Sequence, residues 1–507
     1  MKKFSFSFFA IIFLMYFITT LPVFAEEEDS WEDESIYFIM VDRFNNGDPS
    51  NDFEVNVNDP SAYHGGDFQG IINKLDYIQN MGFTAIWLTP IVNNEPGGYH
   101  GYWTEDFYEV EEHFGTLEEF KQLVEEAHSR GIKVILDLVV NHTGYHHPWL
   151  NDPEKADWFH VAKPIFDYDN QEEVETGQLA GLPDLNQENP EVEDYLIKMA
   201  KWWIEETDID GYRLDTVKHV PKWFWEDFSR EVKSVKQDFF LIGEVWHNDP
   251  NYSQAYVESG IDSVVDYPMY NVLSNVFASP DQNISNLYKI WERNTTIYKN
   301  PYILGNFLDN HDNIRFAEKA EQNGQNPSTR LKQALTYMYT APGIPIIYYG
   351  TEIAMPGGAD PDNRRMMEFK DHELIDYISS LSTIRAEHPA LTKGEFQLLY
   401  DGSSVMAYTR TYEDEKVLVI INDSSESQIT KIATEDLGAN KQLQSLLNDK
   451  TIRDKHGQYA IELDGQTAQI YLLQEHESNT VMYLIGGVVL LLVIVFGILL
   501  IRRKKVA

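Results

Sequence analysis

The stretch that decides the fold is Gly211-Tyr212-Arg213-Leu214-Asp215-Thr216-Val217-Lys218-His219, or GYRLDTVKH. It starts apolar, places a carboxylate, Asp215, where a strand would end, and carries three basic side chains. This order predicts a barrel strand that delivers a carboxylate and its electrostatic support to one mouth of the barrel. The alternative is a buried Asp–Arg ion pair that only closes a strand, because structural ion pairs also perturb carboxylates. Other parts of the sequence are needed to distinguish these two interpretations.

Seven other short apolar runs have the composition of buried parallel strands. They lie at 36–41, 83–88, 133–138, 239–244, 263–265, 302–308 and 344–349. Helical spacing separates most of them, as at 71–81, 117–130 and 191–206. Eight buried strands that alternate with helices predict an α/β fold of the (β/α)8 TIM-barrel type. An open doubly wound sheet would need a glycine-rich phosphate turn after the first strand, and DRFNNG at 42–47 is not one.

Two parts of the chain depart from the barrel pattern. Residues 142–190 are polar and weakly periodic, and they are too many for a simple connection. They predict a small inserted domain, domain B, after strand three of the barrel, which takes up 26–388. Alternating short strands at 396–400, 405–410, 416–421 and 469–472 then predict a C-terminal antiparallel β-sandwich, domain C, over 389–475.

Both ends of the chain have the composition of targeting segments. Residues 1–25 combine two lysines, an apolar run and a small-residue cleavage site, which is typical of a signal peptide. Residues 481–501 carry no charge and are long enough to span a bilayer, and the basic tail 502–507 follows. The sequence therefore predicts a secreted, cell-surface protein with a single membrane-spanning helix, its catalytic domain outside and its C-terminus in the cytoplasm. A buried core helix is the alternative for 481–501.

The composition of the chain restricts which partners we expect it to bind. The chain has 40 Lys and Arg against 81 Asp and Glu, for a formal net charge of −41. A field of that sign repels phosphate backbones and attracts cations, so nucleic acid is excluded as an expected partner and calcium is favoured. The absence of cysteine rules out disulfides and thiolate metal sites. We expect a monomer.

Carboxylates gather where the predicted strands end. Asp137 is followed by Asn141 and His142 after strand three, Asp215 ends strand four, Glu244 ends strand five, and Asp312 adjoins His311 after strand seven. All of these ends meet at one mouth of a barrel. Glycoside hydrolysis needs one carboxylate as nucleophile and a second as proton donor. Asp215 and Glu244 are the candidates for this pair.

Five short motifs resemble, in order, those of the α-amylase family of retaining glycoside hydrolases. They are DLVVNH (137–142), LPDLN (182–186), GYRLDTVKH (211–219), GEVW (243–246) and FLDNHD (307–312). An ordered set is far more specific than any single motif. The resemblance covers the barrel, the inserted domain and, by position, the sandwich.

Within that family, the chain is most similar to short bacterial membrane-anchored α-amylases with adjacent tryptophans in the third barrel helix. Trp202 and Trp203 supply this pair here. Helical periodicity places Trp203 on the apolar face, and we expect both indoles to be core residues. The alternative is that Trp202 is exposed and binds a glucan surface.

The resemblance implies an α-amylase that acts on starch and maltodextrins. It implies endo-acting hydrolysis of α-1,4-glucosidic bonds by a retaining double displacement. Asp215 would attack the anomeric carbon, Glu244 would be the acid and base, and Asp312 would bind sugar hydroxyls. Arg213 lies two residues before Asp215, so both side chains point to the same side of a strand and Arg213 favours the ionised nucleophile.

The resemblance also implies a set of substrate-binding residues around the mouth. The predicted set is His100, Tyr102, His142, Arg213, Lys218, His219, His311, Asp360 and Arg364. Tyr102 would stack on a sugar ring, whereas the alternative is a packed aromatic loop. Lys218 and His219 would face the leaving group, and Asp360 and Arg364 would hold more distant glucose units.

Two calcium sites are implied. In the first, Asn141, Asp184 and the carbonyl of His219 would tie the inserted domain to the barrel, since oxygen ligands suit a hard cation. The second is a loop cluster of Asn46, Asp48, Asn51, Asp52, Gly65 and Asp67. An Asx-rich turn without an ion is the alternative for that loop, because the same residues dominate turns.

Two other functions are weighed against this one. A maltogenic or transglycosylating enzyme of the same family is the first, and a glucan-binding ectodomain without catalysis is the second. Cyclodextrin-forming relatives carry a bulky aromatic residue in the centre of the cleft, whereas the corresponding position here falls near Ala180. This difference favours hydrolysis.

Overall fold

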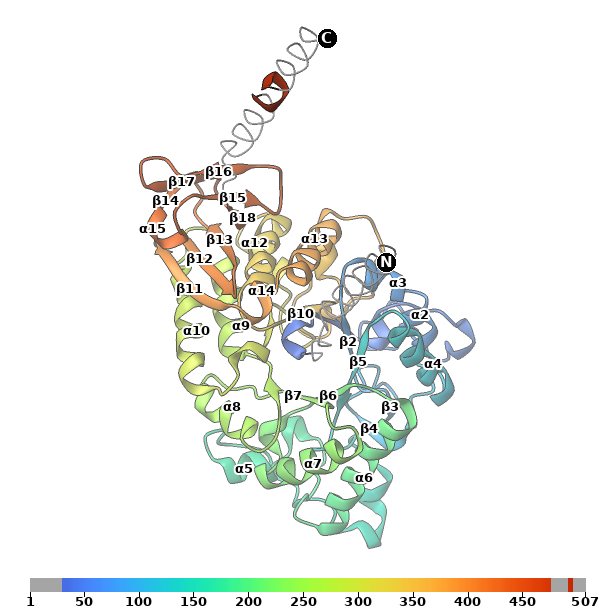
Figure 1. The fold of residues 1–507 in the computed structure, drawn as a ribbon. Helices are drawn as coiled ribbons and strands as arrows, with labels where there is room; N and C mark the ends of the chain where they lie inside the picture. The colour runs from blue at the N-terminus through green and yellow to red at the C-terminus, as the bar shows by residue number, and fades with distance from the viewer. Residues whose placement is uncertain (1–29, 476–490, 496–507) are drawn as a thin grey trace, which may run out of the picture.

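The computed structural model describes residues 30–475 and 491–495 (Figure 1). At its centre is an eight-stranded parallel sheet in the order β8-β7-β6-β5-β2-β1-β10-β9. The strands are β1 (Ile36–Ile39), β2 (Ala85–Leu88), β5 (Lys133–Leu138), β6 (Gly211–Leu214), β7 (Phe240–Gly243), β8 (Ser263–Val264), β9 (Gly305–Phe307) and β10 (Ile344–Tyr348).

A parallel bridge between Val265 and Gly305 joins the two edges of this sheet and closes the barrel. Glycine is required at 305, because a Cβ there would lie 2.7 Å from Ile346 Cδ1 and 2.9 Å from Ile242 Cδ1. The predicted (β/α)8 barrel is confirmed. The strands are buried on both faces, which explains why they are uninterrupted apolar runs.

Helices surround the barrel (Figure 1). They are α2 (Phe68–Ile72), α3 (Leu75–Asn80), α4 (Leu117–His128), α6 (Pro190–Thr207), α7 (Lys222–Val235), α8 (Pro250–Val257), α9 (Tyr267–Phe277), α10 (Ser285–Ile297), α11 (Phe316–Gln322), α12 (Pro327–Thr340) and α13 (Glu373–Glu387). Short 3-10 turns join them: η1 (Trp31–Asp33), η2 (Val41–Arg43), η3 (Pro49–Asn51), η7 (Val217–His219), η8 (Pro301–Ile303), η9 (Thr351–Ile353) and η10 (Asp362–Arg364).

Helix α6 shows how the sequence sets the first and last residues of a helix. Asn189 caps its start by accepting the Glu191 amide, Pro190 occupies the first turn, and the chain leaves at Asp208 in a left-handed conformation. Trp203 is fully buried and donates its indole N–H to Phe107 O at 2.9 Å. Trp202, expected in the core, is only half-buried and lines a surface cavity.

The segment between β5 and α6 is mostly irregular. It holds η4 (Pro148–Asn151), η5 (Pro153–Lys155), α5 (Gln171–Thr176) and η6 (Leu179–Gly181). Isolated bridges, such as His142 with Asp184 and Phe159 with Leu185, fold it back on itself. A hairpin of β3 (Val92–Asn94) and β4 (Thr104–Val110) follows β2, and the sequence did not predict it.

The C-terminal part forms two antiparallel sheets around their own core. The larger contains β11 (Glu395–Asp401), β12 (Val405–Tyr412), β13 (Glu415–Asn422), β18 (Thr467–Glu475), β15 (Lys441–Ser445) and β16 (Thr451–Arg453); the smaller pairs β14 (Gln428–Ala433) with β17 (Gln458–Leu463). Short helices α14 (Ala390–Lys393) and α15 (Thr434–Leu437) flank them. The predicted β-sandwich is confirmed, and β14 to β17 are strands that the sequence did not reveal.

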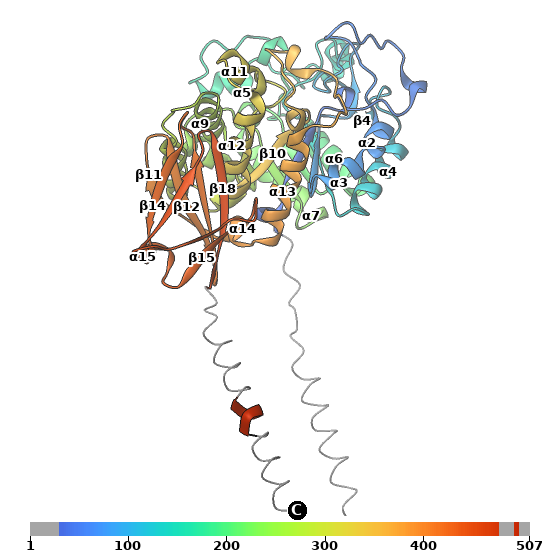
Figure 2. The ribbon, with the colours of Figure 1, turned by 90° about the horizontal axis from the view of Figure 1, so that it is seen from above.

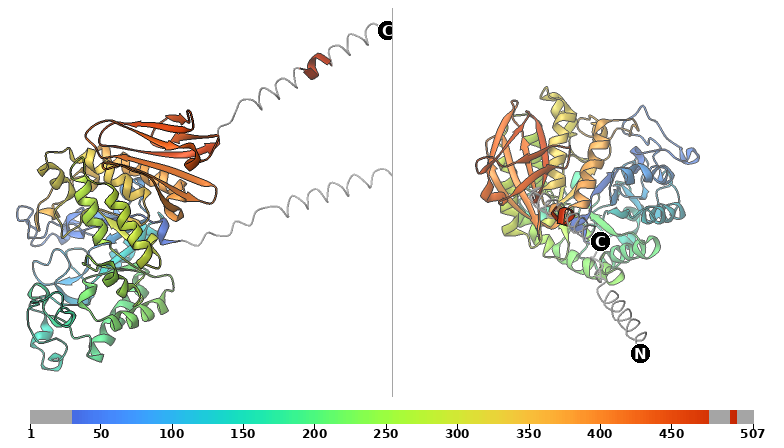
Figure 3. Two further views of the ribbon diagram at one scale, coloured as in Figure 1. Left: turned by 90° about the vertical axis from the view of Figure 1, so that its left-hand side faces the viewer. Right: turned by 45° about the horizontal axis from the view of Figure 1, so that its top comes forward.

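The sandwich packs beside α9 and α12 (Figure 2), at the opposite end of the molecule from the inserted segment (Figure 3). Buried polar contacts join it to α12. Arg330 forms a fully buried ion pair with Asp423, and Arg410 donates to Thr340 O at 2.7 Å. Gln333 also donates to Asn422 O at 2.9 Å. Domain C is thereby fixed to the barrel.

The predicted cell-surface anchoring has to be corrected. Across residues 30–475 and 491–495 no helix is both long enough and apolar enough to cross a membrane. Only 491–495 of the predicted span 481–501 belong to the described residues. The predicted signal peptide, 1–25, and the tail, 502–507, lie outside them.

Candidate active site

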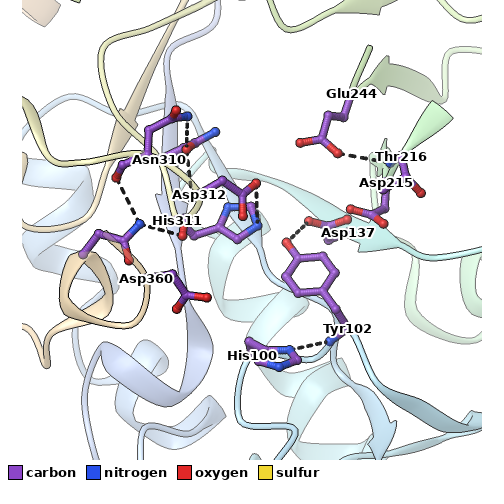
Figure 4. Close-up of polar contacts among 12 residues, drawn as sticks. His100, Tyr102, Asp137, Asp215, Thr216, Glu244, Asn310, His311, Asp312 and Asp360 are labelled. Atoms are coloured by element: carbon purple, nitrogen blue, oxygen red, sulfur yellow. Dashed lines mark hydrogen bonds and ion pairs between the residues drawn. The ribbon is translucent and has the colours of Figure 1, made fainter. Parts of the chain in front are cut away.

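A cleft of about 760 Å³ opens where the barrel strands end. Its wall contains nearly all of the predicted catalytic and substrate-binding side chains (Figure 4). These are His100, Tyr102, His142, Asp215, Lys218, His219, Glu244, His311, Asp312, Asp360 and Arg364. Arg213 is buried below the wall. The fold therefore brings together residues that are up to 264 positions apart in the chain, from His100 to Arg364.

One guanidinium organises the carboxylates. Arg213 Nη1 lies 2.6 Å from Asp215 Oδ1 and 2.9 Å from Asp137 Oδ1, while its Nη2 lies 2.6 Å from Glu244 Oε1. Arg213 is 1% exposed. Burial raises the pKa of Asp215, and the adjacent Arg213 charge acts in the opposite direction. The pair of carboxylates on one cation is the central feature of the site.

Glu244 has two further hydrogen bonds. Its Oε1 accepts the Tyr267 hydroxyl at 3.0 Å, and its Oε2 accepts the Thr216 amide at 3.1 Å. Thr216 has a left-handed backbone, with φ of 46°, and this conformation turns the chain directly after Asp215. Burial raises the pKa of Glu244, Arg213 lowers it, and Asp215 raises it.

Asp137 supports the base of the cleft. It accepts the Tyr102 hydroxyl at 2.8 Å and the Trp87 indole N–H at 3.2 Å, in addition to Arg213. Burial raises its pKa to about 7. Tyr102 is thus fixed at both ends, because its amide donates to His100 Nδ1 at 3.0 Å.

Asp312 lies across the cleft on the segment that follows β9 (Figure 4). Its amide donates to Asn310 Oδ1 at 3.0 Å, and its carboxylate lies 3.5 Å from both His311 Nε2 and Arg364 Nη2. Arg364 also contacts Asp360 Oδ1 at 3.1 Å. Burial raises the pKa of Asp312.

The cleft histidines are neutral near pH 7. Burial lowers the pKa of His142 to about 4 and that of His219 to about 3, and it also lowers the pKa values of His100 and His311. Among the described residues, the buried atoms His142 Nε2 and His311 Nδ1 have no hydrogen-bond partner. Such atoms are suited to ligand hydroxyls, since buried polar groups are otherwise paired.

Several lining residues were missed by sequence reasoning. Trp246 is 47% exposed and stacks on Tyr267, with ring centroids 4.9 Å apart. Lys218 Nζ donates to Trp246 O at 3.1 Å, so both form one wall of the cleft. Trp246 belongs to the GEVW motif and could have been found there. Tyr168 comes from the inserted segment and has no such signal.

The residues of the first predicted calcium site meet at the junction of barrel and inserted segment. Asn141 Oδ1 and Asp184 Oδ1 are buried and have no hydrogen-bond partner in the described part of the chain. His219 is buried nearby, and its Nδ1 lies 3.0 Å from Val174 O. The two oxygens belong to segments that the His142–Asp184 bridge joins, and unpaired oxygens of this kind fit a hard cation.

The residues of the second predicted site also lie together. Asn46 Nδ2 donates to both oxygens of Asp52, at 2.7 and 2.9 Å, and Gly65 packs against this pair. Asp67 accepts the amides of Gly47 and Asp48 and caps α2. Within the described part of the chain, Asn51 Oδ1 is the one side-chain oxygen of this loop that is buried without a partner, and most of the others are already hydrogen-bonded.

Across the described residues, no group of three or more His, Cys, Asp and Glu side chains could hold a metal ion. Any ion at either site would therefore depend on amide and carbonyl oxygens as well as carboxylates.

A (β/α)8 barrel with this carboxylate set at its mouth defines a glycoside hydrolase. Residues 38–379 match the alpha amylase catalytic domain, and residues 394–471 match the alpha-amylase C-terminal domain. The chain belongs to the α-amylase family, glycoside hydrolase family 13, whose members act on α-glucans.

The relatives of the chain include amylases and a cyclomaltodextrinase. The chain is 42% identical over 461 residues to a beta/alpha-amylase of Paenibacillus polymyxa, covering 87% of this chain but only 38% of that protein. It is 36% identical to a cyclomaltodextrinase of Thermoanaerobacter pseudethanolicus, covering 78% and 71% of the two chains. A crystal structure of an Anoxybacillus α-amylase is 62% identical, covers 89% of this chain and all of that one, and has a TM-score of 0.88.

Proposed function

We propose that the chain hydrolyses α-1,4-glucosidic bonds in starch and maltodextrins and retains the anomeric configuration. The observation that carries this proposal is the single guanidinium, Arg213, that contacts both Asp215 and Glu244 at 2.6 Å. Retaining enzymes need carboxyl groups only about 5 to 5.5 Å apart, whereas inverting enzymes leave about 6.5 to 9.5 Å for a water. Two carboxylates on one cation suit the shorter separation.

In the proposed reaction, Asp215 attacks the anomeric carbon while Glu244 protonates the leaving oxygen. Glu244 then removes a proton from water, and that water releases the sugar from Asp215. The two residues have suitable environments, since Asp215 contacts Arg213 directly and Glu244 has its pKa raised by burial and by the neighbouring Asp215 charge. Arg213 stabilises the negative charge that moves between them.

The other cleft residues would bind the sugar that is attacked. Neutral His142 and His311 offer ring nitrogens that have no partner among the described residues, and Asp312 lines the same cleft. Tyr102 is parallel to His311, with centroids 5.1 Å apart and an interplanar angle of 6°. We assign Tyr102 as the platform for this sugar, because its half-buried ring lines the cleft and its hydroxyl is fixed by Asp137.

A maltogenic or transglycosylating activity is the second candidate. The name of the cyclomaltodextrinase relative favours this activity over purely endo-acting hydrolysis. Trp246 supports it too, because an exposed indole beside Glu244 provides a surface on which an acceptor sugar could replace water. Ala180, a small residue in the cleft wall, leaves room for either.

We also propose that calcium binds at Asn141, Asp184 and the carbonyl of His219. The support is that buried oxygens of Asn141 and Asp184 have no hydrogen-bond partner within residues 30–475 and 491–495. An ion there would join the inserted segment to the barrel. The loop site formed by Asn46, Asp52 and their neighbours stays a prediction.

The experiment that tests the main proposal follows the products of maltoheptaose and soluble starch over time. We expect short malto-oligosaccharides whose newly released reducing ends are first in the α configuration, as seen by proton NMR. Products longer than maltoheptaose would favour the transglycosylating candidate. Release of the β anomer first would overturn the retaining mechanism.

A further inference from the structure

The segment that carries Asp312 is irregular. It joins β9 to α11 over residues 308–315, without helix or strand, and it places Asp312 opposite the carboxylates that follow β6 and β7 (Figure 4). A local turn shapes it, because Asn310 Oδ1 accepts the Asp312 amide at 3.0 Å and Asn313 Nδ2 at 2.7 Å. A turn of this kind does not fix where the segment lies relative to the barrel. The position of Asp312 therefore depends on contacts from another element.

A side chain from the loop after β10 makes these contacts. Asn363, in η10, is fully buried, and its Nδ2 donates to His311 O at 2.7 Å and to Asn313 O at 3.0 Å. A side-chain amide has two N–H donors, so both are used here. The two carbonyls belong to the residues directly before and after Asp312. One side chain thus holds the backbone on both sides of this carboxylate.

Asn363 is in turn fixed to the barrel. Arg315 is fully buried and donates its Nε to Asn363 O at 2.9 Å and its Nη1 to Tyr349 O at 2.8 Å. Its guanidinium carbon also lies 4.3 Å from the centroid of the Tyr348 ring. Tyr348 is the last residue of β10. Hydrogen bonds therefore connect the end of a barrel strand, through Arg315 and Asn363, to the segment that carries Asp312.

The neighbouring Arg364 has a different place in this arrangement. Its Nε also donates to His311 O, at 2.9 Å, but its guanidinium lies 3.5 Å from Asp312 Oδ1 and lines the cleft. Arg364 can therefore contact a substrate directly. Asn363 lies behind the wall of the cleft and is not one of its lining residues, so it acts on a substrate only through the segment it holds.

We propose that Asn363 is a positioning residue, whose side-chain amide sets where the carboxylate of Asp312 meets the substrate. This inference rests on the proposed function, in which Asp312 binds the sugar that is attacked. Contacts to sugar hydroxyls that strengthen in the transition state contribute to glycoside hydrolysis. Misplacement of a reacting or binding group by about 1 Å can cost about a hundredfold in rate. Asn363 therefore acts on kcat rather than on binding of the ground state.

The first test measures kcat and KM on maltoheptaose. Asn363→Leu keeps a similar side-chain size and removes both donors. We expect kcat to fall about 10- to 100-fold while KM changes by less than about threefold, because the lost contact belongs to the transition state. An unchanged kcat, or a change in KM alone, would overturn the positioning role.

The matched control is Asn422→Leu in the β-sandwich. Asn422 is also fully buried, and its Nδ2 donates to the carbonyls of Glu426 and Leu463 at 3.0 and 3.1 Å. Asn422→Leu should lower the melting temperature but leave kcat unchanged within about twofold. Equal falls of kcat in the two variants would show that lost stability is the cause, and the positioning role would be refuted.

A double-mutant cycle with Asp312→Asn separates positioning from a purely structural effect. If Asn363 acts through the Asp312 carboxylate, then adding Asn363→Leu to Asp312→Asn should lower kcat further by less than about threefold. Losses that multiply in full would overturn the inference while the unmodified chain still cleaves its substrate. Absence of cleavage by the unmodified chain would instead overturn the proposed function. Should Asn363→Leu fail to fold by circular dichroism, Asn363→Ser replaces it in the same cycle and is judged by the same outcomes.

Discussion

At the scale of the single residue, Arg213 sets the chemistry of the cleft. Its guanidinium is buried and contacts Asp137, Asp215 and Glu244. Burial alone would push all three carboxylates towards the neutral form, and the cation opposes this. Because two reacting groups share one counter-charge, loss of a proton from either changes the proton affinity of the other.

The first prediction concerns Asp215. Asp215→Asn should lower kcat on maltoheptaose by about three or more orders of magnitude, because no other nucleophile is in place. Reducing-end release measures this, and circular dichroism checks the fold. Asp360→Asn is the control, since Asp360 is 51% exposed at the cleft rim and should cost less than about tenfold. Activity above about one per cent for Asp215→Asn would contradict the assignment.

The second prediction concerns the proton donor. Tyr267 donates a hydrogen bond to Glu244 and thereby favours its ionised form. Tyr267→Phe should raise the pKa of Glu244, and since the acid must be protonated to act, the alkaline limb of kcat/KM should move to higher pH. We expect about half a unit to one unit, which is about 0.7 to 1.4 kcal/mol.

A pH profile of kcat/KM measures this shift. Tyr270→Phe is the matched control, because Tyr270 stacks on Phe307 nearby, with centroids 4.7 Å apart. An alkaline limb that moves to lower pH, or that stays in place, would mean that Glu244 is not the acid.

Whether a site residue can be predicted from the sequence depends on the element to which it belongs. Asp215, Glu244 and Asp312 sit in contiguous motifs at strand ends, so residue type and position both identify them. Tyr267 starts a helix 23 residues after Glu244, and the parallel pairing of β7 with β8 brings it to that carboxylate. Tyr168 enters the cleft from an irregular segment, and irregular backbone has no periodicity to read.

At the scale of the element, the inserted segment is docked on the cleft wall through α5. Gln171 Nε2 donates to Lys218 O at 3.0 Å, and Gln171 Oε1 accepts the Tyr252 hydroxyl at 2.5 Å. Val174 O faces His219 Nδ1. The η7 turn, which carries Lys218 and His219, is therefore held by the inserted segment as well as by β6.

The third prediction tests the ion proposed at this junction. A chelator should lower the melting temperature of the unmodified chain by a few degrees, because an ion that binds only the folded state stabilises it by mass action. Asp184→Ala should remove most of that decrease. Differential scanning calorimetry with and without chelator measures both.

Asp52→Ala serves as the comparison for the loop cluster. A chelator effect that persists in Asp184→Ala and disappears in Asp52→Ala would move the ion to the loop. A melting temperature that no chelator changes would remove both proposed sites.

Elements differ in how well the sequence reveals them. The barrel strands are buried on both faces, so each is an apolar run that can be recognised alone. Strand β3 has only three residues and β4 carries three acidic side chains, so neither stands out from a loop. Strands β14 and β17 form a two-stranded sheet of their own, and five of their twelve residues are exposed.

At the scale of the whole molecule, a buried ion pair helps to hold the β-sandwich against the barrel. Arg330 on α12 contacts Asp423 after β13, and it also donates to the carbonyls of Phe277 and Ser279 at 2.7 and 3.0 Å. Both charged side chains are fully buried. Removal of one partner would leave an uncompensated charge at the interface.

The fourth prediction follows from this pair. Arg330→Met should destabilise the protein by about 3 to 5 kcal/mol, the usual effect of breaking a buried ion pair. Burial already raises the pKa of Asp423 to about 6, and loss of the cation would raise it further. A carboxyl with a raised folded-state pKa costs stability as pH rises, so the loss should be greater at pH 8 than at pH 5.

Urea unfolding at the two pH values measures this loss. Adding Asp423→Leu to Arg330→Met should restore part of it, because the unpaired charge is then gone. Arg230→Met is the control: Arg230 is 64% exposed, and a surface pair contributes only about 0 to 1 kcal/mol. A loss that is equal at both pH values would show that Asp423 is not the cause.

Strand pairing is not uniform around the barrel, because an isolated bridge between Val265 and Gly305 closes it. Strand β8 has two residues and β9 three, so this seam has fewer inter-strand hydrogen bonds than the joint between β1 and β2, where four residue pairs are in register. Tyr267 follows one side of the seam and Asp312 the other. Brief opening of this seam would widen the cleft between Tyr267 and Asp312 while Asp215 and Arg213 stay fixed. Faster deuterium uptake at the amides of 265–267 than at those of 211–214 would reveal such opening.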